Sequence, residues 1–330
     1  MAQRKPWSVR VRRAVGGFVI DGFFRSASVL GRLHPLARPA RHRVVVERGL
    51  RYCAGDEPCH QLDIYRPRDA VGPLPIVLYV HGGGFRILSK DTHWMMGLAF
   101  ARAGYLVFNI SYRLAPRHRF PAALQDCGEA LSWVVEHATS LGGDLDRLVF
   151  AGESAGANLV TSLAAMTAYR RDEPWARKVF ELGVVPRAVL PYCGILQVSD
   201  PGRFRRRKPD KISAFLDDRL SEVSDAYLGP TPHARLGDTM DLADPLVWLE
   251  RGEAPDRPLP PCFATVGTRD PLLDDTRRLD EALRRLGVVS EARYYEGGVH
   301  AFHALVWRPE ARECWADSFR FMKRHLSATR

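Results

Sequence analysis

The amino-acid sequence predicts an α/β fold, in which a central, mostly parallel sheet is flanked by helices on both faces. Short apolar segments typical of buried strands alternate with helical segments over residues 44–326. Strands covered on both faces read as continuous apolar runs, and their alternation with helices indicates parallel pairing. The chain has 330 residues, 46% of them hydrophobic and 26% charged, which is ordinary globular composition. We therefore expect one domain over residues 1–330.

The expected elements follow one another along the chain as strands separated by helices. Strands are expected at 44–46, 61–65, 76–80, 105–110, 147–151, 186–192, 261–266 and 291–295. Helices are expected at 94–102, 121–139, 155–169, 272–286 and 312–326. Each of the first four helices lies between two strands, as the crossover connections of a parallel sheet require.

The positive charge of the chain is concentrated near its N-terminus. Lys and Arg number 48 against 38 Asp and Glu. Residues 1–43 contain ten of these bases and one acid, Asp21, which leaves 38 bases and 37 acids in residues 44–330. Nucleic-acid-binding domains carry a clustered excess of basic side chains, so the nearly neutral remainder argues against nucleic acid as a partner.

Residues 11–33 are expected to form an amphipathic helix in two pieces, divided near Gly16 and Gly17. Apolar and small residues recur at helical spacing along one side. That face consists of Val11, Val15, Phe18, Val19, Gly22, Phe23, Ser26, Val29, Leu30 and Leu33. Our first interpretation is a helix that packs this face on its own domain. The alternative is a basic amphipathic helix in weak contact with an anionic membrane surface.

The expected cellular compartment is the cytoplasm. The apolar core of an export signal runs uninterrupted to a cleavage site, whereas Asp21, Arg25 and Arg32 interrupt it here. No uncharged apolar stretch approaches the roughly 20 residues that cross a bilayer. The six cysteines are spread along the chain without a CxxC pair, so we expect reduced thiols rather than disulfides.

Residues 198–246 have no buried-strand pattern and are too long for an ordinary connection between two strands. We interpret this segment as an inserted lid of short helices, two of them at 213–217 and 221–227. A basic run near its start is expected to be a solvated loop, with a site for phosphate or an acidic partner as the alternative. The run consists of Arg203, Arg205, Arg206, Arg207 and Lys208.

A nucleophile motif lies between a predicted strand and a predicted helix. Gly152-Glu153-Ser154-Ala155-Gly156 follows the strand at 147–151 and opens the helix at 155–169. A G-x-S-x-G sequence in this position places its serine on a sharp strand-to-helix turn, and the glycines leave room for the strained backbone. Ser154 is therefore the candidate nucleophile.

A serine hydroxyl needs a base that takes its proton and a third group that orients the base. In the arrangement that uses this motif, the acid and then the histidine follow the serine along the chain. His300 comes after the Gly297-Gly298 turn that ends the last predicted strand. It is the candidate base, and His303 is its competitor. The two histidines could suggest a metal pair, but no further ligand lies near them in sequence, so we expect neither a metal nor a cofactor.

The candidate acid is Asp270. It lies on the loop directly after the strand at 261–266. Asp274 and Asp275 fall in the next helix, where acids in the first turn are favoured by the helix dipole and need no catalytic explanation. Asp126 precedes the serine and lies in a predicted helix, so we interpret it as a structural or surface carboxylate.

A glycine-rich loop supplies candidate hydrogen-bond donors for acyl transfer. His81-Gly82-Gly83-Gly84-Phe85 directly follows the buried strand at 76–80. Consecutive glycines allow backbone N–H groups to approach a ligand closely, and acyl transfer needs donors aimed at the developing oxyanion. The spacing does not fit the G-x-G-x-x-G pattern of dinucleotide sites.

Taken together, these motifs resemble the hormone-sensitive-lipase family of carboxylesterases, which has the alpha/beta-hydrolase fold. The resemblance covers residues 81–302 and rests on ordered motifs. They are His81 to Phe85, Ser111-Tyr112-Arg113-Leu114-Ala115-Pro116, Phe120 to Cys127, Gly152 to Gly156 with Asn158, Asp270-Pro271-Leu272, and Gly297 to Phe302. The family often has aspartate at the positions of Glu153 and Ser111 and glycine at that of Ala157. These departures lie outside the three candidate catalytic residues.

The resemblance implies Ser154 as nucleophile, His300 as base and Asp270 as its orienting acid. It implies an oxyanion hole formed by the N–H groups of Gly83, Gly84 and Ala155. It also implies a cap made of residues 1–43 and 198–246, and a role for His81 in orienting the glycine loop.

We therefore expect a serine carboxylesterase that hydrolyses short- to medium-chain esters through an acyl-enzyme. The chain-length preference comes from the resemblance. An amidase, deacetylase or formamidase with the same three residues, a non-catalytic receptor and a membrane-surface lipase are the alternatives. The expected partner is a small-molecule ester substrate, and a homodimer is left open.

Overall fold

The computed structural model describes residues 7–207, 209–210, 212–229 and 236–327, with the backbone alone for residues 7–15 and 17–20. Within these residues, one eight-stranded sheet forms the centre of the fold. Its strands are β1 (Val44–Arg51), β2 (Gln61–Pro67), β3 (Leu74–Val80), β4 (Leu106–Ile110), β5 (Gly143–Glu153), β6 (Ala188–Tyr192), β7 (Cys262–Gly267) and β8 (Ser290–Tyr295). Their order is β1-β2-β4-β3-β5-β6-β7-β8. The pairs β1/β2 and β2/β4 are antiparallel and the others are parallel, so β2 runs opposite to the other seven strands, whose carboxyl ends share one edge.

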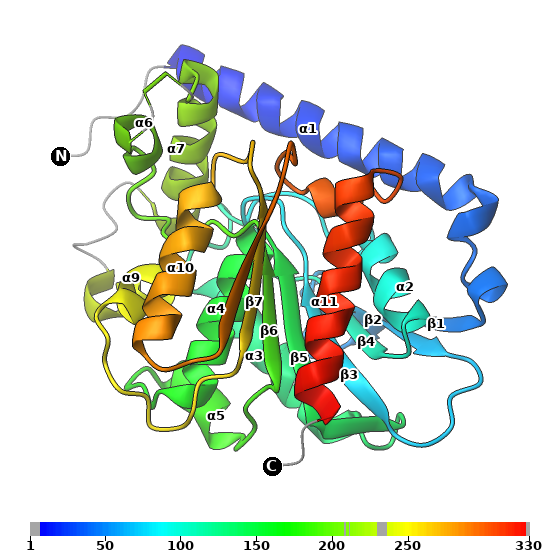
Figure 1. The fold of residues 1–330 in the computed structure, drawn as a ribbon. Coiled ribbons are helices and arrows are strands. Elements are labelled where there is room, and N and C mark those ends of the chain that lie inside the picture. The colour runs from blue at the N-terminus through cyan, green and yellow to red at the C-terminus, as the bar shows by residue number, and fades with distance from the viewer. Residues whose placement is uncertain (1–6, 208, 211, 230–235, 328–330) are drawn as a thin grey trace.

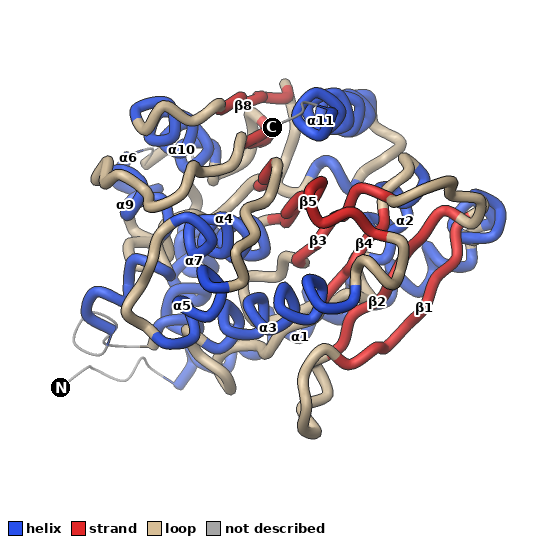
Figure 2. The backbone as a smooth tube through the Cα atoms, turned by 90° about the horizontal axis from the view of Figure 1, so that it is seen from below, coloured by secondary structure: helices blue, strands red, loops and turns tan. Residues whose placement is uncertain are grey.

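Helices cover both faces of this sheet (Figure 1 and Figure 2). They are α1 (Trp7–Leu33), α2 (Trp94–Arg102), α3 (Ala122–His137), α4 (Ala155–Ala168), α5 (Pro174–Glu181), α6 (Arg203–Arg207), α7 (Ala214–Leu228), α9 (Pro245–Glu250), α10 (Leu273–Arg285) and α11 (Pro309–Ser327). Successive side chains of a strand point to opposite faces. Ile76 and Leu78 of β3 accordingly join the core beneath α3 and α4, whereas Val77 joins the core beneath α2 and α11.

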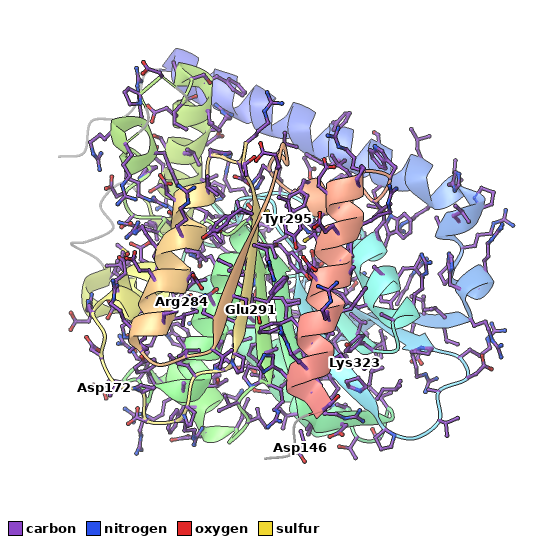
Figure 3. The ribbon with its side chains drawn as sticks, in the orientation of Figure 1. Asp146, Asp172, Arg284, Glu291, Tyr295 and Lys323 are labelled. Carbon is purple, nitrogen blue, oxygen red and sulfur yellow. The ribbon has the colours of Figure 1, made fainter. Side chains whose placement is uncertain are left out.

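The last strand is attached to the last helix by polar contacts at both of its ends. Tyr295 of β8, labelled in Figure 3, donates its hydroxyl to Asp317 of α11 at 3.0 Å. Arg324 of α11 donates to Glu291 of β8 at 2.6 Å. These contacts fix the strand that leads into the loop carrying His300.

The predicted α/β architecture is confirmed, with every expected strand and helix present and shifted by a few residues at its ends. Three helices were not predicted, α5, α6 and α9, which have eight, five and six residues. The six cysteines are free, as the sequence predicts.

The N-terminal helix differs from its prediction in two respects. The backbone is helical without interruption from Trp7 to Leu33, so the predicted division near Gly16 and Gly17 is wrong. The face expected to pack on the domain also points elsewhere in its described part: Phe23, Leu30 and Leu33 are exposed. The helix contacts the domain through polar groups instead, which include Ser28 and Arg32.

The inserted segment is helical, but its parts differ from those expected. The helices expected at 213–217 and 221–227 are one helix, α7, which begins after Ser213, whose hydroxyl accepts a hydrogen bond from the Leu216 N–H at 3.2 Å. The two ends of the segment meet, because the Asp244 carboxylate accepts hydrogen bonds from the N–H groups of Val198 and Ser199. The inserted segment therefore begins and ends at the same place on the domain.

The basic run at 203–207 forms α6 and is not the expected solvated loop. Arg203 is buried, and its guanidinium donates to the carboxylate of Asp275 in α10 at 2.5 Å. The same carboxylate accepts the N–H of Leu196 at 2.9 Å. Asp275 thus holds the inserted segment on α10. This ion pair explains an acid at this position better than the helix dipole does. Lys208 lies outside the described residues.

Replacing Arg203 should destabilise the fold, because it leaves the Asp275 carboxylate buried without its cation. We expect Arg203→Ala to lower the free energy of unfolding by about 3–5 kcal/mol, measured by urea denaturation at pH 7. The matched control is Arg205→Ala, since Arg205 belongs to the same helix but pairs with Asp217 at the surface at 3.3 Å. That change should cost less than about 1 kcal/mol, and equal losses in the two variants would contradict the assignment.

Candidate active site

Ser154 lies at the turn between β5 and α4, in a backbone conformation that side chains rarely adopt, with φ 54° and ψ −111°. Its N–H donates to the Tyr192 carbonyl at 2.8 Å. The turn is closed by tight packing at Gly156, where a Cβ atom would lie 2.1 Å from the Val80 carbonyl oxygen. Only glycine fits at this position, so the motif spacing fixes where the Ser154 hydroxyl points.

Ser154, His300 and Asp270 form one hydrogen-bonded line. The Ser154 hydroxyl lies 3.0 Å from His300 Nε2, and His300 Nδ1 lies 2.8 Å from Asp270 Oδ2. The carboxylate is buried, and its other oxygen accepts the N–H of Leu272 at 2.8 Å. An acceptor at Nδ1 holds the proton there and leaves Nε2 free to accept the serine proton. The three predicted residues are thus brought together from elements 116 and 30 residues apart in the chain.

The loops after β7 and β8 bring the acid to the histidine. Thr268 donates its N–H to the Tyr295 carbonyl at 3.0 Å, and Arg269 donates to the Gly298 carbonyl at 3.0 Å. Gly297 in turn donates its N–H to the Thr268 hydroxyl at 2.9 Å. These reciprocal bonds join the two loops, because β7 and β8 are parallel neighbours whose carboxyl ends share one edge of the sheet.

The Asp270 carboxylate also changes the protonation equilibrium of His300. The imidazole is only partly buried, with 39% of its side chain exposed, and this burial opposes its charged form. The charge of Asp270 and the hydrogen bond to it outweigh burial and raise the pKa of His300 well above its ordinary value. The ring therefore binds a proton more tightly than a solvated histidine does.

The glycine loop after β3 lies against Ser154, because a Cβ atom at Gly82 would lie 3.4 Å from the Ser154 Cβ. Gly83 has φ 108° and Gly84 has φ 58°, in the region that favours glycine. Among the residues that the structure describes, none accepts a backbone hydrogen bond from the N–H of Gly83 or Gly84. Ala155 is the first residue of α4, where backbone N–H groups have no partner within the helix. All three predicted donors are thus backbone N–H groups that lack a helical or strand partner.

His81 is buried behind the glycine loop. Its Nδ1–H donates to the Gly82 carbonyl at 2.7 Å, and its ring stacks on Tyr112 with centroids 4.2 Å apart. Burial lowers the pKa of His81 to about 3, which keeps the ring neutral. A neutral, buried imidazole bonded to the loop backbone agrees with a positioning role rather than proton transfer.

His303, the competing base, lies in a different place. Its side chain is fully buried, with Nε2 3.2 Å from Glu153 Oε2, and its ring stacks on Tyr192. His93 approaches the other Glu153 oxygen at 3.5 Å. Burial opposes ionisation of Glu153, but the two imidazoles outweigh it and hold its pKa well below the usual range. The two histidines therefore hold the side chain of Glu153, the residue directly before Ser154, in a fixed position.

The sequence did not point to Cys193, which lies beside the acid and the base. Its sulfur, a nitrogen of His300 and an oxygen of Asp270 lie within 4.8 Å of one another. Burial raises the pKa of Cys193, so its thiol is protonated at neutral pH. The sequence offered one indication of this position: Cys193 directly follows β6, and the carboxyl ends of parallel strands carry the site residues of such sheets.

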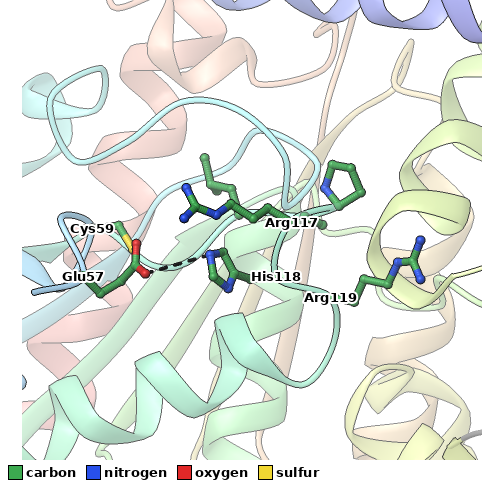
Figure 4. A pocket seen from close by; sticks show the side chains of 8 residues that line it. Glu57, Cys59, Arg117, His118 and Arg119 are labelled. Carbon is green, nitrogen blue, oxygen red and sulfur yellow. Dashed lines mark hydrogen bonds and ion pairs between the residues drawn. The ribbon is translucent and has the colours of Figure 1, made fainter. Parts of the chain in front are cut away.

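A separate cavity of about 690 Å³ lies away from these residues (Figure 4). Its lining includes Glu57, Cys59 and His118. Close to it, Cys59, His60 and Asp126 place possible metal-ligand atoms within 4.8 Å of one another. The Asp126 carboxylate already accepts hydrogen bonds from the guanidinium and the N–H of Arg113 at 2.6–3.0 Å. The Arg113 guanidinium therefore already pairs with this carboxylate. This agrees with the interpretation of Asp126 as a structural residue.

Comparisons with known proteins agree with this geometry. A family model described as alpha/beta hydrolase fold matches residues 77–304. The carboxylesterase NlhH of Mycobacterium tuberculosis is 34% identical over 272 residues, which cover 80% of this chain and 78% of the relative. An acetyl esterase of Salmonella schwarzengrund is 30% identical over 258 residues, which cover 77% of this chain and 74% of the relative.

Solved structures show the same architecture. A hyperthermophilic esterase from the archaeon Pyrobaculum calidifontis superimposes with a TM-score of 0.73 at 26% identity, over 94% of this chain and 92% of that one. The family model, the sequence relatives and the fold point to the same group. The chain therefore belongs to the hormone-sensitive-lipase-like carboxylesterases of the alpha/beta-hydrolase superfamily.

Proposed function

We propose that this carboxylesterase hydrolyses short- to medium-chain carboxylic esters through an acyl-enzyme, with Ser154 as nucleophile, His300 as base and Asp270 as orienting acid. The observation that carries the proposal is the hydrogen-bonded line from the Ser154 hydroxyl through His300 to the buried Asp270 carboxylate. This line has the geometry that a base-activated serine requires.

In the first step, His300 Nε2 takes the Ser154 proton while the serine oxygen attacks the ester carbonyl. The carbonyl π bond breaks to give a tetrahedral oxyanion, which the N–H groups of Gly83, Gly84 and Ala155 stabilise. The oxyanion collapses, the bond to the alkoxy oxygen breaks, and the imidazolium returns its proton to the leaving alcohol. Water then attacks the acyl-enzyme with the same imidazole as base and releases the acid and Ser154.

The inserted segment supports a preference for small acyl groups, because α7 lies directly against the glycine loop. A Cβ atom at Gly84 would lie 2.8 Å from a methyl group of Val223. Phe85 stacks on Tyr227 with centroids 3.7 Å apart, and Arg86 pairs with Glu222 at 2.7 Å. These contacts support the proposed cap of residues 1–43 and 198–246, because α7 belongs to it and lies against the loop of the proposed oxyanion donors. The acetyl esterases among the relatives agree with a short acyl chain.

Hydrolysis of para-nitrophenyl esters from acetate to palmitate tests the activity and the chain length together. We expect turnover to be highest for the short and medium esters and to be abolished by a serine-directed organophosphate. Mass spectrometry should find the adduct on Ser154 and not on Cys193, whose thiol lies beside the same imidazole. A labelled Ser154 without ester turnover would favour an amide substrate, and an unlabelled Ser154 would contradict the proposal.

Two histidine variants distinguish the base from its neighbour. His300→Ala should lower kcat by about 10³-fold or more, because the serine loses its proton acceptor. His303→Ala should keep a larger part of the activity, since its ring contacts Glu153 and Tyr192 and does not reach the serine. Steady-state kinetics on the acetate ester measures both, with thermal unfolding as a check of the fold. The reverse order of losses would exchange the two roles.

The pH dependence of kcat/KM should follow deprotonation of His300. The imidazole must be neutral to accept a proton, and its pKa is raised by Asp270. Activity should therefore be low in acid and rise through a midpoint above about 6.5, the ordinary histidine value. Asp270→Asn removes the charge, so it should lower kcat and move the midpoint to lower pH. A midpoint that stays in place in Asp270→Asn would contradict this assignment.

A further inference from the structure

The outward face of α1 is apolar, while its inward face is polar. Asp21 accepts the N–H of Leu88 at 3.2 Å, and Ser28 and Arg32 donate to the Asp91 carbonyl at 3.0 and 2.5 Å. These three positions are seven and four residues apart, so they share one side of the helix. Leu30 and Leu33 lie on the other side, with 66% and 70% of their surface exposed.

The exposed apolar residues of α1 follow one another closely along the helix. Among its described side chains, the large exposed ones are Phe23, Phe24, Val29, Leu30 and Leu33, and Leu36 follows in the next turn. Single exposed apolar residues are common and need no explanation, but contiguous apolar patches mark interaction surfaces. An apolar stripe that turns away from its own domain requires another apolar partner.

Further exposed apolar side chains come from two other elements at the same end of the molecule. Val306 and Trp307 belong to the loop between β8 and α11, and Phe215 belongs to the first turn of α7. Figure 1 places both this loop and α7 at the end of the molecule along which α1 runs. The contact of α7 with α1 is close, because a Cβ atom at Gly16 would lie 2.9 Å from the Arg219 guanidinium. Three elements thus present exposed apolar side chains at one end of the molecule.

The charge of the same segment identifies the partner. Residues 1–43 contain ten bases and one acid, and among the described ones Arg25, Arg38 and Arg41 are exposed. Basic and apolar residues together are the composition of segments that lie in the interface of an anionic bilayer. A second copy of the chain would bring two such basic segments together, and their repulsion opposes that pairing. Among the described residues, no helix is long and apolar enough to span a membrane, so contact would be with the surface.

We propose that this surface, defined as the outward side of α1 from Phe23 to Leu36 with Phe215, Val306 and Trp307, docks on an anionic phospholipid bilayer. The carboxyl ends of β5 and β7, which lead to Ser154 and Asp270, face the same end of the molecule. Docking therefore turns the esterase site toward the lipid. The docking itself does not depend on the proposed catalytic roles.

Vesicle sedimentation of the full-length protein tests the proposal. The probes are vesicles of equal parts phosphatidylglycerol and phosphatidylcholine, and vesicles of phosphatidylcholine alone. We expect binding to the anionic vesicles that weakens from 50 to 500 mM salt, because screening reduces the electrostatic attraction. The double variant Leu30→Asp, Leu33→Asp should bind about tenfold more weakly or worse, since both apolar side chains leave the interface.

The matched control is Val71→Asp, in the turn between β2 and β3, whose side chain is also exposed. It removes an exposed apolar residue at the opposite end of the strands and should bind as the unchanged protein does. Thermal unfolding of each variant checks the fold. Equal binding by the three proteins, or no binding by the unchanged one, would overturn the proposal. Self-association without vesicles that the double variant abolishes would also overturn it and assign the surface to a second copy.

Discussion

The close packing of α4 against β3 is the constraint on which the rest of the site depends. A Cβ atom at Gly156 would lie 2.1 Å from the Val80 carbonyl oxygen, so the helix begins in direct contact with the neighbouring strand. The chain can make this turn only if Ser154 takes a strained conformation, which costs about 1–3 kcal/mol. The strain is held by the Tyr192 carbonyl, which accepts the Ser154 N–H. Strands β3, β5 and β6 together therefore fix the orientation of the Ser154 side chain.

A second constraint lies below the serine. Glu153 is a buried carboxylate that faces His93 at the start of α2 and His303 in the loop after β8. A buried charge without partners would be costly, so these two imidazoles and the carboxylate hold one another in place. Because His303 comes three residues after His300, the same contact fixes the loop that carries His300. His303 therefore has a structural role, which its position near His300 in the sequence does not reveal.

Prediction from sequence succeeded where the signal is local. The buried strands are continuous apolar runs, and Ser154 and Asp270 each follow such a strand. His300 follows the glycine turn after β8, which is parallel to β7, so one sheet brings the three residues to one edge. Prediction failed where the structure of a segment depends on residues far from it in the sequence. Arg203 looks solvated until Asp275, 72 residues away, is placed beside it. Helices α5 and α9 are too short for periodicity to show, although Pro174 and Pro245 occupy their first positions, where proline is favoured.

The N-terminal helix shows why an amphipathic pattern does not fix the direction of packing. Periodicity identifies the apolar side of a helix, but that side faces the domain only if the domain offers it an apolar surface. Here the loop at Leu88 and Asp91 offers an N–H and a carbonyl, which Asp21, Ser28 and Arg32 satisfy. Leu88 is buried, and a buried N–H without a partner is costly, so the polar side of α1 turns inward. The apolar side then lies outward, at the end of the molecule where the loops that carry Ser154 and Asp270 lie.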